Sequence, residues 1–367
     1  MINLNKIALS LALASSAVAF AGNPDRQGQA GAQQLVVNGW GRSSGLGWSG
    51  MSTVRGVEAS YMNIAGLSKA NMTEAAFTRT NWLSGSGLNI NSFGFAQQLG
   101  NGNTLGVSVQ QWGVAPITIT TEDQPYGGLG TYRVSMTNIG VGYARKFNDQ
   151  ISVGMMFRGV NEGIPDARAL GVSLDAGVMY TNTSDPTSTV KTNDIHFGIV
   201  LKNIGPDMRH TGDGLSTKAV VQNGDYTKTV QHRVDRFQLP TVLAMSAAYD
   251  FRLDGDPDAY YHRLTVGAGF ANHAFQANET SLGLEYAYNN FISTRLGFTY
   301  QEGIFNYDTR ITAYTGLTAG LSLDIPFSTG SGEKSNLGID YSYRATNPFG
   351  GTHSFGVRID LNYETAN

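Results

Sequence analysis

Histidine, serine and carboxylate side chains are the residue types in this chain that could carry catalysis or bind a metal ion. The six histidines show neither metal-ligand spacing nor an HExxH pattern, and no G-x-S-x-G elbow or phosphate-binding loop is present. A hydrolase with a serine and a histidine meeting on one surface stays the weaker alternative. The 367 residues include no cysteine, which excludes a disulfide framework, a thiolate metal site and a cysteine nucleophile. We therefore expect no cofactor, no metal site and no enzymatic activity.

One acidic run, Asp254-Gly255-Asp256-Pro257-Asp258, resembles a fragment of a calcium-binding loop. It lacks the full ligand spacing and the terminal glutamate of such a loop. Since aspartate, glycine and proline all favour turns, the run predicts a turn between two extended segments.

The composition departs from that of a soluble domain. Charged residues make up 14% of the chain and 46 residues are glycine, against about 25% and roughly 7% in average domains. The mean hydropathy of −0.18 shows that aliphatic residues have not replaced the missing charged residues. The net charge of −3 gives no electrostatic reason to expect a nucleic-acid partner.

Residues 1–21 have the pattern of a secretory signal peptide. Lys6 supplies a positive charge, an apolar stretch follows, and Ala19-Phe20-Ala21 fits the cleavage pattern before Gly22. A short transmembrane anchor is the alternative, but the apolar stretch is below the 18 or so residues that a spanning helix needs. We expect an exported protein.

Apolar residues alternate with polar or small ones in runs of roughly 10 to 13 residues from residue 71 to the end. These runs exceed the usual strand of about five or six residues and approach the length of a tilted strand that crosses a bilayer. We predict about fourteen strands. They cover residues 71–80, 88–97, 103–113, 134–146, 151–161, 169–181, 194–204, 240–251, 261–271, 280–289, 291–301, 310–323, 335–345 and 353–363.

The connections between these runs favour an antiparallel transmembrane β-barrel. If the first strand leaves the periplasm, the longest connections, 115–133 and 205–240, fall outside the cell, as in bacterial outer-membrane barrels. A closed barrel also pairs every backbone group within the hydrocarbon layer. A secreted β-sandwich or fibre is the alternative, but its strands would be shorter and its outer face polar.

Charged residues on the inward parity of the strands define the predicted lumen. The turn at Asn289-Asn290 places Glu285 diagonal to Arg295, and Asp340 lies next to Arg358 on an adjacent strand. Two interpretations stay open: ion pairs inside a narrow lumen, or a charged constriction along a solute path. The inward charges are Arg158, Asp175, Lys202, Glu285, Arg295, Asp340, Arg344, Arg358 and Asp360.

Residues 22–70 precede the first strand and carry no strand pattern. The segment is rich in glycine and serine around Trp40 and Trp48. We expect it to fold into the lumen as a plug, with a disordered tail as the alternative. The predicted organisation is thus a signal peptide at 1–21, a plug at 22–70 and a barrel at 71–367.

Within that segment the sequence resembles the N-terminal signature of FadL-like barrels and their PorV/PorQ relatives. The signature usually ends Asn-Pro-Ala-Gly-Leu, and Asn63, Ala65, Gly66 and Leu67 match it while Ile64 replaces the proline. The PorV/PorQ branch is also similar in three later segments. These are 201–208 with 212–215, Leu239-Pro240-Thr241, and Gly283-Leu284-Glu285-Tyr286.

The resemblance implies a fourteen-stranded barrel and a role in the type IX secretion system of a Gram-negative outer membrane. Members bind the C-terminal signal domains of secreted cargo, associate with the translocon and deliver cargo to a surface attachment complex. Such recognition would use outer loops, and the leading candidates are Pro206, Asp207, Met208, Gly212, Asp213 and Gly214. Two alternatives are a FadL-like channel for hydrophobic small molecules and a porin-like or structural barrel without a partner.

Overall fold

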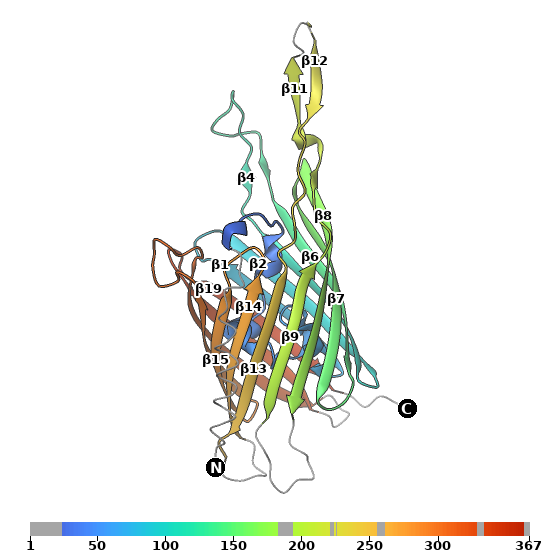
Figure 1. Ribbon diagram of the computed structural model, residues 1–367, viewed down its shortest axis with the longest axis vertical. Helices are drawn as coiled ribbons and strands as arrows, with labels where there is room; N and C mark the ends of the chain where they lie inside the picture. Colours follow the sequence, from blue (N-terminus) through green and yellow to red (C-terminus); the bar gives the residue numbers. More distant parts are fainter. Residues whose placement is uncertain are drawn as a thin grey trace.

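Strand pairing closes the molecule into a barrel (Figure 1). The computed structural model describes residues 24–182, 194–220, 224, 226–254, 261–328 and 334–362. Residues 1–21, most of the acidic run at 254–258 and the last five residues lie outside this part of the chain. Within it, fourteen antiparallel strands follow one another around a ring that the pairing of β8 with β9 completes. The predicted fold class, an all-β transmembrane barrel with an N-terminal plug, is confirmed.

The strands of the barrel wall agree with the predicted alternation. They are β1 (Thr73–Trp82), β2 (Leu88–Gly100), β3 (Asn103–Gly113), β6 (Ser135–Lys146), β7 (Ile151–Ile164), β8 (Ala167–Asn182), β9 (Ile195–Ile204), β13 (Val242–Arg252), β14 (His262–His273), β15 (Glu279–Tyr288), β16 (Ile292–Gln301), β17 (Tyr314–Ser328), β18 (Lys334–Thr346) and β19 (Thr352–Leu361).

The outward face of the wall is apolar and exposed. Phe77, Val141, Leu282 and Ile339 each show between 45% and 60% of their surface. Their chain neighbours on the other parity are buried, as the inside of a filled barrel requires. No helix among the described residues is both long enough and apolar enough to span a bilayer.

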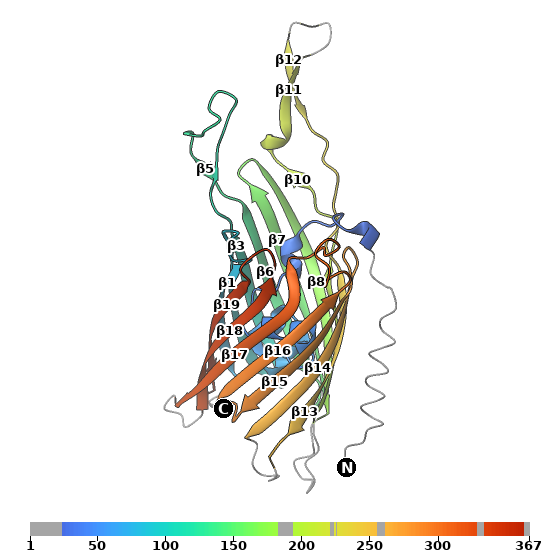
Figure 2. The ribbon, with the colours of Figure 1, turned by 90° about the vertical axis from the view of Figure 1, so that its left-hand side faces the viewer.

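The two ends of the barrel differ. At one end, the connections that the structure describes in full are tight turns, such as the one between β2 and β3 (Figure 1). At the other, long segments rise beyond the wall (Figure 2). These segments contain β4 (Ile117–Thr118) and β5 (Thr131–Tyr132), then β10 (His210–Thr211), η7 (Asp213–Leu215), β11 (Ser216–Val220) and β12 (Thr227–Gln231). We call this second end the outer end.

The N-terminal segment threads the lumen from the outer end to the turn end. It enters beside β13, where the backbone N–H of Gly31 donates to the carbonyl of Gln238 at 3.1 Å. It leaves at the turn end, where β1 begins. On the way it forms short 3₁₀ helices, η1 (Pro24–Arg26), η2 (Gln33–Val36), η3 (Ser43–Gly45), η4 (Gly47–Gly50), η5 (Gly56–Ser60) and η6 (Ile64–Lys69). We call residues 24–70 the plug.

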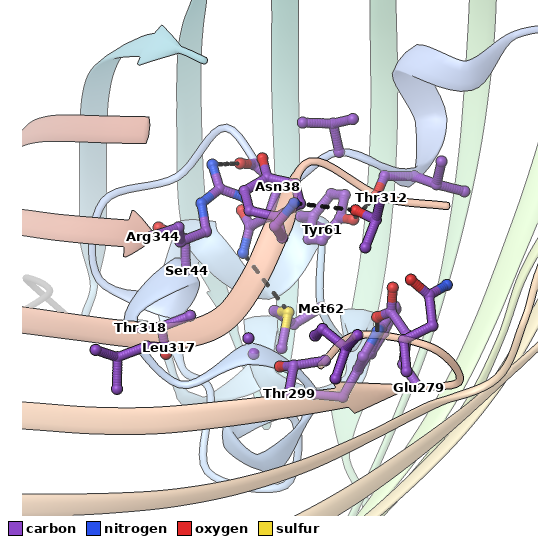
Figure 3. Close-up of a pocket in the computed structure, with 18 residues that line it drawn as sticks. Asn38, Ser44, Tyr61, Met62, Glu279, Thr299, Thr312, Leu317, Thr318 and Arg344 are labelled. Carbon is purple, nitrogen blue, oxygen red and sulfur yellow. Dashed lines mark hydrogen bonds between the residues drawn. The ribbon is translucent and has the colours of Figure 1, made fainter. Parts of the chain in front are cut away.

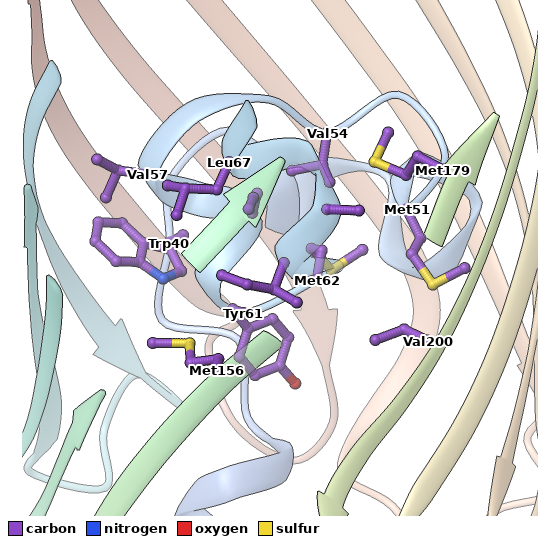
Figure 4. Close-up of a cluster of buried hydrophobic side chains, with 14 of the residues drawn as sticks. Trp40, Met51, Val54, Val57, Tyr61, Met62, Leu67, Met156, Met179 and Val200 are labelled. Carbon is purple, nitrogen blue, oxygen red and sulfur yellow. The ribbon is translucent and has the colours of Figure 1, made fainter. Parts of the chain in front are cut away.

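An apolar cluster holds the plug against the inner wall (Figure 4). Trp40, Met51 and Leu67 of the plug are 3% exposed or less, and they share the cluster with Met156 and Met179 of the strands. Since a disordered tail would leave these side chains in water, the plug prediction is confirmed for the described residues.

Glycines on the inward parity make room for this packing. A Cβ on Gly142 would lie 2.7 Å from Ile64, and one on Gly154 would lie 2.8 Å from the backbone of the same residue. Both distances are shorter than side chains tolerate. Part of the high glycine content therefore serves the contact between wall and plug.

One predicted register was wrong. Glu285 faces Arg295 directly rather than diagonally. The prediction assumed a two-residue turn at Asn289-Asn290, but the turn has a third residue, Phe291, whose N–H donates to the carbonyl of Tyr288 at 2.9 Å. One added residue shifts the pairing by one position.

Candidate functional site

Asn63 of the predicted N-terminal motif fastens the plug to the barrel seam. Its side-chain oxygen accepts from the N–H of Ala65 at 3.1 Å, which caps η6. Its amide nitrogen donates to the carbonyls of Val178 on β8 and Ile199 on β9, at 3.2 and 3.4 Å. β8 and β9 are the two strands whose pairing closes the ring. The motif asparagine therefore ties the plug to the point of closure.

The other motif residues shape the plug around that asparagine. Ala65 and Leu67 are 1% exposed or less, and Leu67 packs where Gly106 of β3 leaves space. A Cβ on Gly66 would overlap the carbonyl of Val54. These residues act in packing within the lumen, with no face toward an external partner.

Arg158 connects two strands and the plug. Its guanidinium donates to Asp175 of β8 at 2.8 and 3.0 Å and to the backbone carbonyl of Ser60. The other oxygen of Asp175 accepts from the N–H of Asn203 at 2.8 Å. Arg158 and Asp175 are 6% and 2% exposed. Such a dry, hydrogen-bonded pair makes a rigid joint rather than a site for passing ions.

Glu285 and Arg295 form a second joint across the lumen face of the wall. Arg295 Nε donates to Glu285 at 2.6 Å, and Arg263 donates to the other carboxylate oxygen at 2.9 Å. Arg295 also donates to Ser322 of β17 at 2.6 Å. Three neighbouring hairpins are thereby cross-linked.

Arg358 gathers the acidic residues near β1. It contacts Asp324 and Asp360, and its Nε lies 3.9 Å from a carboxylate oxygen of Asp340, which is diagonal to it on β18. Among the described residues, seven of the nine predicted lumen charges form ion pairs with an oppositely charged side chain, and Lys202 and Arg344 are the exceptions. This arrangement favours the ion-pair interpretation over the charged constriction.

Lys202 is fully buried, and among the described residues no carboxylate forms an ion pair with its ammonium group. Its ammonium lies 3.7 Å from the centre of the Tyr61 ring. A cation over an aromatic face is stabilised by the ring quadrupole, more so when both are desolvated. β9 and the plug are joined there as well.

The predicted outer-loop residues divide into exposed and structural ones. Pro206, Asp207, Asp213 and Gly214 are exposed. Met208, by contrast, is 1% exposed and cannot meet a partner directly. It packs in a cluster at the base of the loop with Ala32, Leu35, Val160, Ala169 and Leu239.

The Gly212–Gly214 run rests on the turn between β7 and β8. The N–H of Gly214 donates to the carbonyl of Asp166 at 2.9 Å. A Cβ on Gly212 would overlap that same carbonyl, and Gly212 has φ +150°. Residues 212–214 therefore fix the point at which the outer loop 205–240 rises from the barrel wall.

Above this base, β11 and β12 form a two-stranded ribbon that projects from the outer end (Figure 2). Among the described strands they pair only with each other, and nine of their ten residues are exposed. The sequence prediction placed this segment in a loop. Its Thr- and Val-containing runs, 216–220 and 227–231, carried a strand signal that could have revealed it.

A cavity of about 130 Å³ lies at the outer end between the plug and β15 to β18 (Figure 3). Trp48, Tyr61, Leu317, Glu279 and Arg344 are among its lining residues. The Tyr61 hydroxyl donates to the carbonyl of Val36 at 2.7 Å, and burial raises its pKa. Sequence reasoning placed Arg344 in the lumen but did not detect the cavity, because residues 36–62 and 279–344 meet only in three dimensions.

The part of the chain that the structure describes contains no group of three or more histidine, aspartate or glutamate side chains arranged to hold an ion.

No family model matches the chain. No curated protein matches it either. Among solved structures it is similar to the toluene transporter TbuX of Ralstonia pickettii, with a TM-score of 0.48 and 12% identity over 90% of this chain and 100% of that one.

Two further barrels are similar to the same degree. One is a FadL homologue of Pseudomonas aeruginosa, with a TM-score of 0.46 and 12% identity over 88% of this chain and 97% of that one. The other is the toluene transporter TodX of Pseudomonas putida, with a TM-score of 0.46, 10% identity and the same coverage. At these scores the likenesses carry no conclusion about a ligand or partner, and the fold rests on the strand pairing itself.

Proposed function

We propose that the chain is an outer-membrane accessory barrel of the type IX secretion system, of the PorV/PorQ kind. In this proposal its outer loops bind the C-terminal signal domains of secreted cargo, the translocon, or both, and pass cargo to attachment-complex proteins. We also propose that the protein lies in the outer membrane of a Gram-negative bacterium and is exported through a signal peptide that is cleaved after Ala21. The observation that carries it is the β11–β12 ribbon, held above the membrane on a packed base.

The packing of the lumen supports a docking role over a transport role. The plug is bound to the wall by Asn63, Arg158 and Lys202, and its apolar side chains are buried. A protein that moves solutes would need to displace these contacts in each cycle. A protein that presents a surface gains from a rigid support.

The ribbon has the properties of a protein-recognition element. An isolated two-stranded ribbon is at best marginally stable in water and presents unpaired edges. An extended segment of a partner can add to such an edge through main-chain hydrogen bonds. Lys218 and Lys228 give the described part of the ribbon a positive charge, which favours an acidic partner segment.

Replacing residues 216–231 by a short Gly-Ser linker tests the proposal in a native strain. The N–H of His232 and the carbonyl of Leu215 already meet at 2.7 Å, so the linker has little distance to cover. Cargo should be lost from the cell surface in a deletion strain and in a strain carrying the linker variant, and restored by the full chain. Normal display of all cargo in the deletion strain would end the proposal.

A second candidate is a FadL-like channel for hydrophobic small molecules. The cavity at the outer end, lined in part by Trp48, Tyr61 and Leu317, favours it. This candidate requires an uptake defect for such compounds in the deletion strain while cargo display stays normal.

A further inference from the structure

Arg79 stands on the outward side of the barrel wall. On β1 the residues Phe77, Arg79 and Asn81 are exposed, whereas Thr78 and Thr80 between them are buried toward the lumen. Among the described residues the Arg79 side chain forms no ion pair and no hydrogen bond. A charge that faces lipid is costly unless it lies near the headgroups and has a partner there. The exposed guanidinium therefore indicates an anionic partner outside the chain.

Exposed phenylalanines surround Arg79 on three adjacent strands. The pairing places Arg79 opposite Phe355 of β19, and it places Phe77, two residues closer to the turn end, opposite Phe93 of β2. These three rings are 60%, 48% and 48% exposed, in the order Phe355, Phe77 and Phe93. We call them the phenylalanine patch. The guanidinium thus stands at the edge of an apolar surface that faces the membrane.

Toward the outer end, carboxamides replace the apolar residues on this side of the wall. The outward positions there are Asn81 on β1, Asn89 and Asn91 on β2, and Gln111 on β3. β16 differs, because Leu296 and Tyr300 keep its outward side apolar or aromatic up to the residue before its last one. The change from phenylalanine to arginine and then to amides is therefore local to β1, β2, β3 and β19.

This order of side chains matches the order of groups in a phosphorylated glycolipid. A guanidinium binds two phosphate oxygens through its planar fork. Acyl chains on the membrane side of the phosphate would cover the phenylalanine patch, and sugar hydroxyls on the other side would meet the amides. A protein partner would have to displace lipid from the wall, whereas a lipid already lies against it.

We propose that Arg79, the phenylalanine patch and the neighbouring amides bind one phosphorylated glucosamine lipid of the outer leaflet. The guanidinium holds the phosphate, the rings contact the acyl chains, and the amides bind sugar hydroxyls. The inference takes from the proposed function only the outer-membrane location, and it requires neither cargo binding nor transport. Lipid binding is measured on the purified protein and cargo display in cells, so each can fail alone.

The test uses the full chain folded in detergent micelles and two probes, lipid A that carries a phosphate and the same lipid after removal of the phosphate. Native mass spectrometry measures the lipid that stays on the barrel. Native protein should retain one phosphorylated lipid and lose the dephosphorylated one. Arg79→Gln should lower retention of the phosphorylated lipid by about tenfold or more, as expected for a lost hydrogen bond between charged groups. Arg79→Lys should restore part of it, because an ammonium keeps the charge without the fork.

Two further variants separate this site from general attraction of anions. Arg133→Gln removes an exposed arginine between β5 and β6, off the strands of the wall, and should retain the phosphorylated lipid as native protein does. Phe93→Ala removes part of the phenylalanine patch and should lower retention even if the Arg79 variants fail to fold, which heat-modifiable migration on gels reports.

The comparison of the two lipids on native protein needs no variant. The proposal is overturned if native protein retains both lipids equally. It is also overturned if folded Arg79→Gln retains the phosphorylated lipid as native protein does, which would leave this side of the wall to a protein partner. Equal losses in Arg79→Gln and Arg133→Gln would overturn it as well.

Discussion

The side-chain amide of Asn63 donates to the backbone carbonyl of Val178 at 3.2 Å, so a plug residue takes part in the hydrogen bonding of the barrel wall. The wall residue beside it is Gly177, where a Cβ would overlap the Asn63 oxygen. Plug and wall are therefore fitted to each other at the seam between β8 and β9. A barrel closed in this way presents its outer surface on a stable support.

Replacing Asn63 by alanine should loosen the plug. The change leaves the N–H of Ala65 without its cap in a fully buried position, and an unsatisfied buried group costs about 1–3 kcal/mol. In planar bilayers we expect a silent native protein and transient ion conductance from Asn63→Ala. Asn81→Ala, at an exposed asparagine near the end of β1, is the matched control and should stay silent.

Breaking the Arg158–Asp175 pair should be strongly destabilising. Arg158→Met leaves a buried carboxylate without its partner, for which a loss of about 3–5 kcal/mol in unfolding free energy is expected. Lys146→Met removes an ion pair whose side chains are 45% and 93% exposed, and should cost less than about 1 kcal/mol. Urea unfolding of the purified barrels compares the two, and equal losses would contradict a buried joint.

Lys69 should make stability rise with pH. Burial lowers its pKa from 10.5 to about 8, although its ammonium donates to Thr181 at 3.0 Å. Between these values the unfolded chain binds more protons than the folded one, so the unfolding free energy increases with pH. The burial penalty is fully present below pH 8 and disappears above about 10.5.

The Lys69 prediction is checked by comparing native protein with Lys69→Met from pH 7 to pH 10. The native protein should gain up to about 3 kcal/mol relative to the variant, at about 1.4 kcal/mol per pKa unit. The subtraction removes the pH effects that the native protein and the variant share. A difference that does not change with pH would show that Lys69 is not desolvated.

Met208 should control the order of the outer extension. Met208→Ala empties a buried site at the base of loop 205–240 and should cost about 2–5 kcal/mol of local stability. Trypsin should then cut this loop faster than in native protein. Met155→Ala changes a methionine on the outer wall, 52% exposed, and should leave the cleavage rate unaltered.

Alternation predicted the wall well because side-chain parity repeats every two residues regardless of partners. The predicted strand 103–113 agrees with β3 at both ends. The predicted strand 310–323 begins four residues before the first residue of β17 and ends five residues before its last residue. β17 can continue through Pro326 because its pairing with β16 ends at Leu323, before the proline is reached. The N–H that Pro326 lacks therefore leaves no hydrogen bond to β16 unmade.

The candidate site was less accessible to sequence reasoning. Glycine, serine and two tryptophans indicated a plug, but the contact of Asn63 with Val178 and Ile199 depends on the barrel being closed. Met208 was expected to face a partner. It is buried instead, because residues that lie far away along the chain, such as Ala32 and Val160, pack against it. Arg344 had the right parity, but nothing in the sequence indicated that it lines a cavity.

Affinity purification from native outer membranes tests the docking account most directly. The tagged full chain is compared with the chain in which a linker replaces residues 216–231, and heat-modifiable migration on gels verifies that both barrels are folded. We predict that a translocon-class outer-membrane protein or cargo signal domain co-purifies with the full chain, and that its recovery falls by about tenfold or more without the ribbon. Equal recovery with both chains, or no partner with the full chain, would contradict the account.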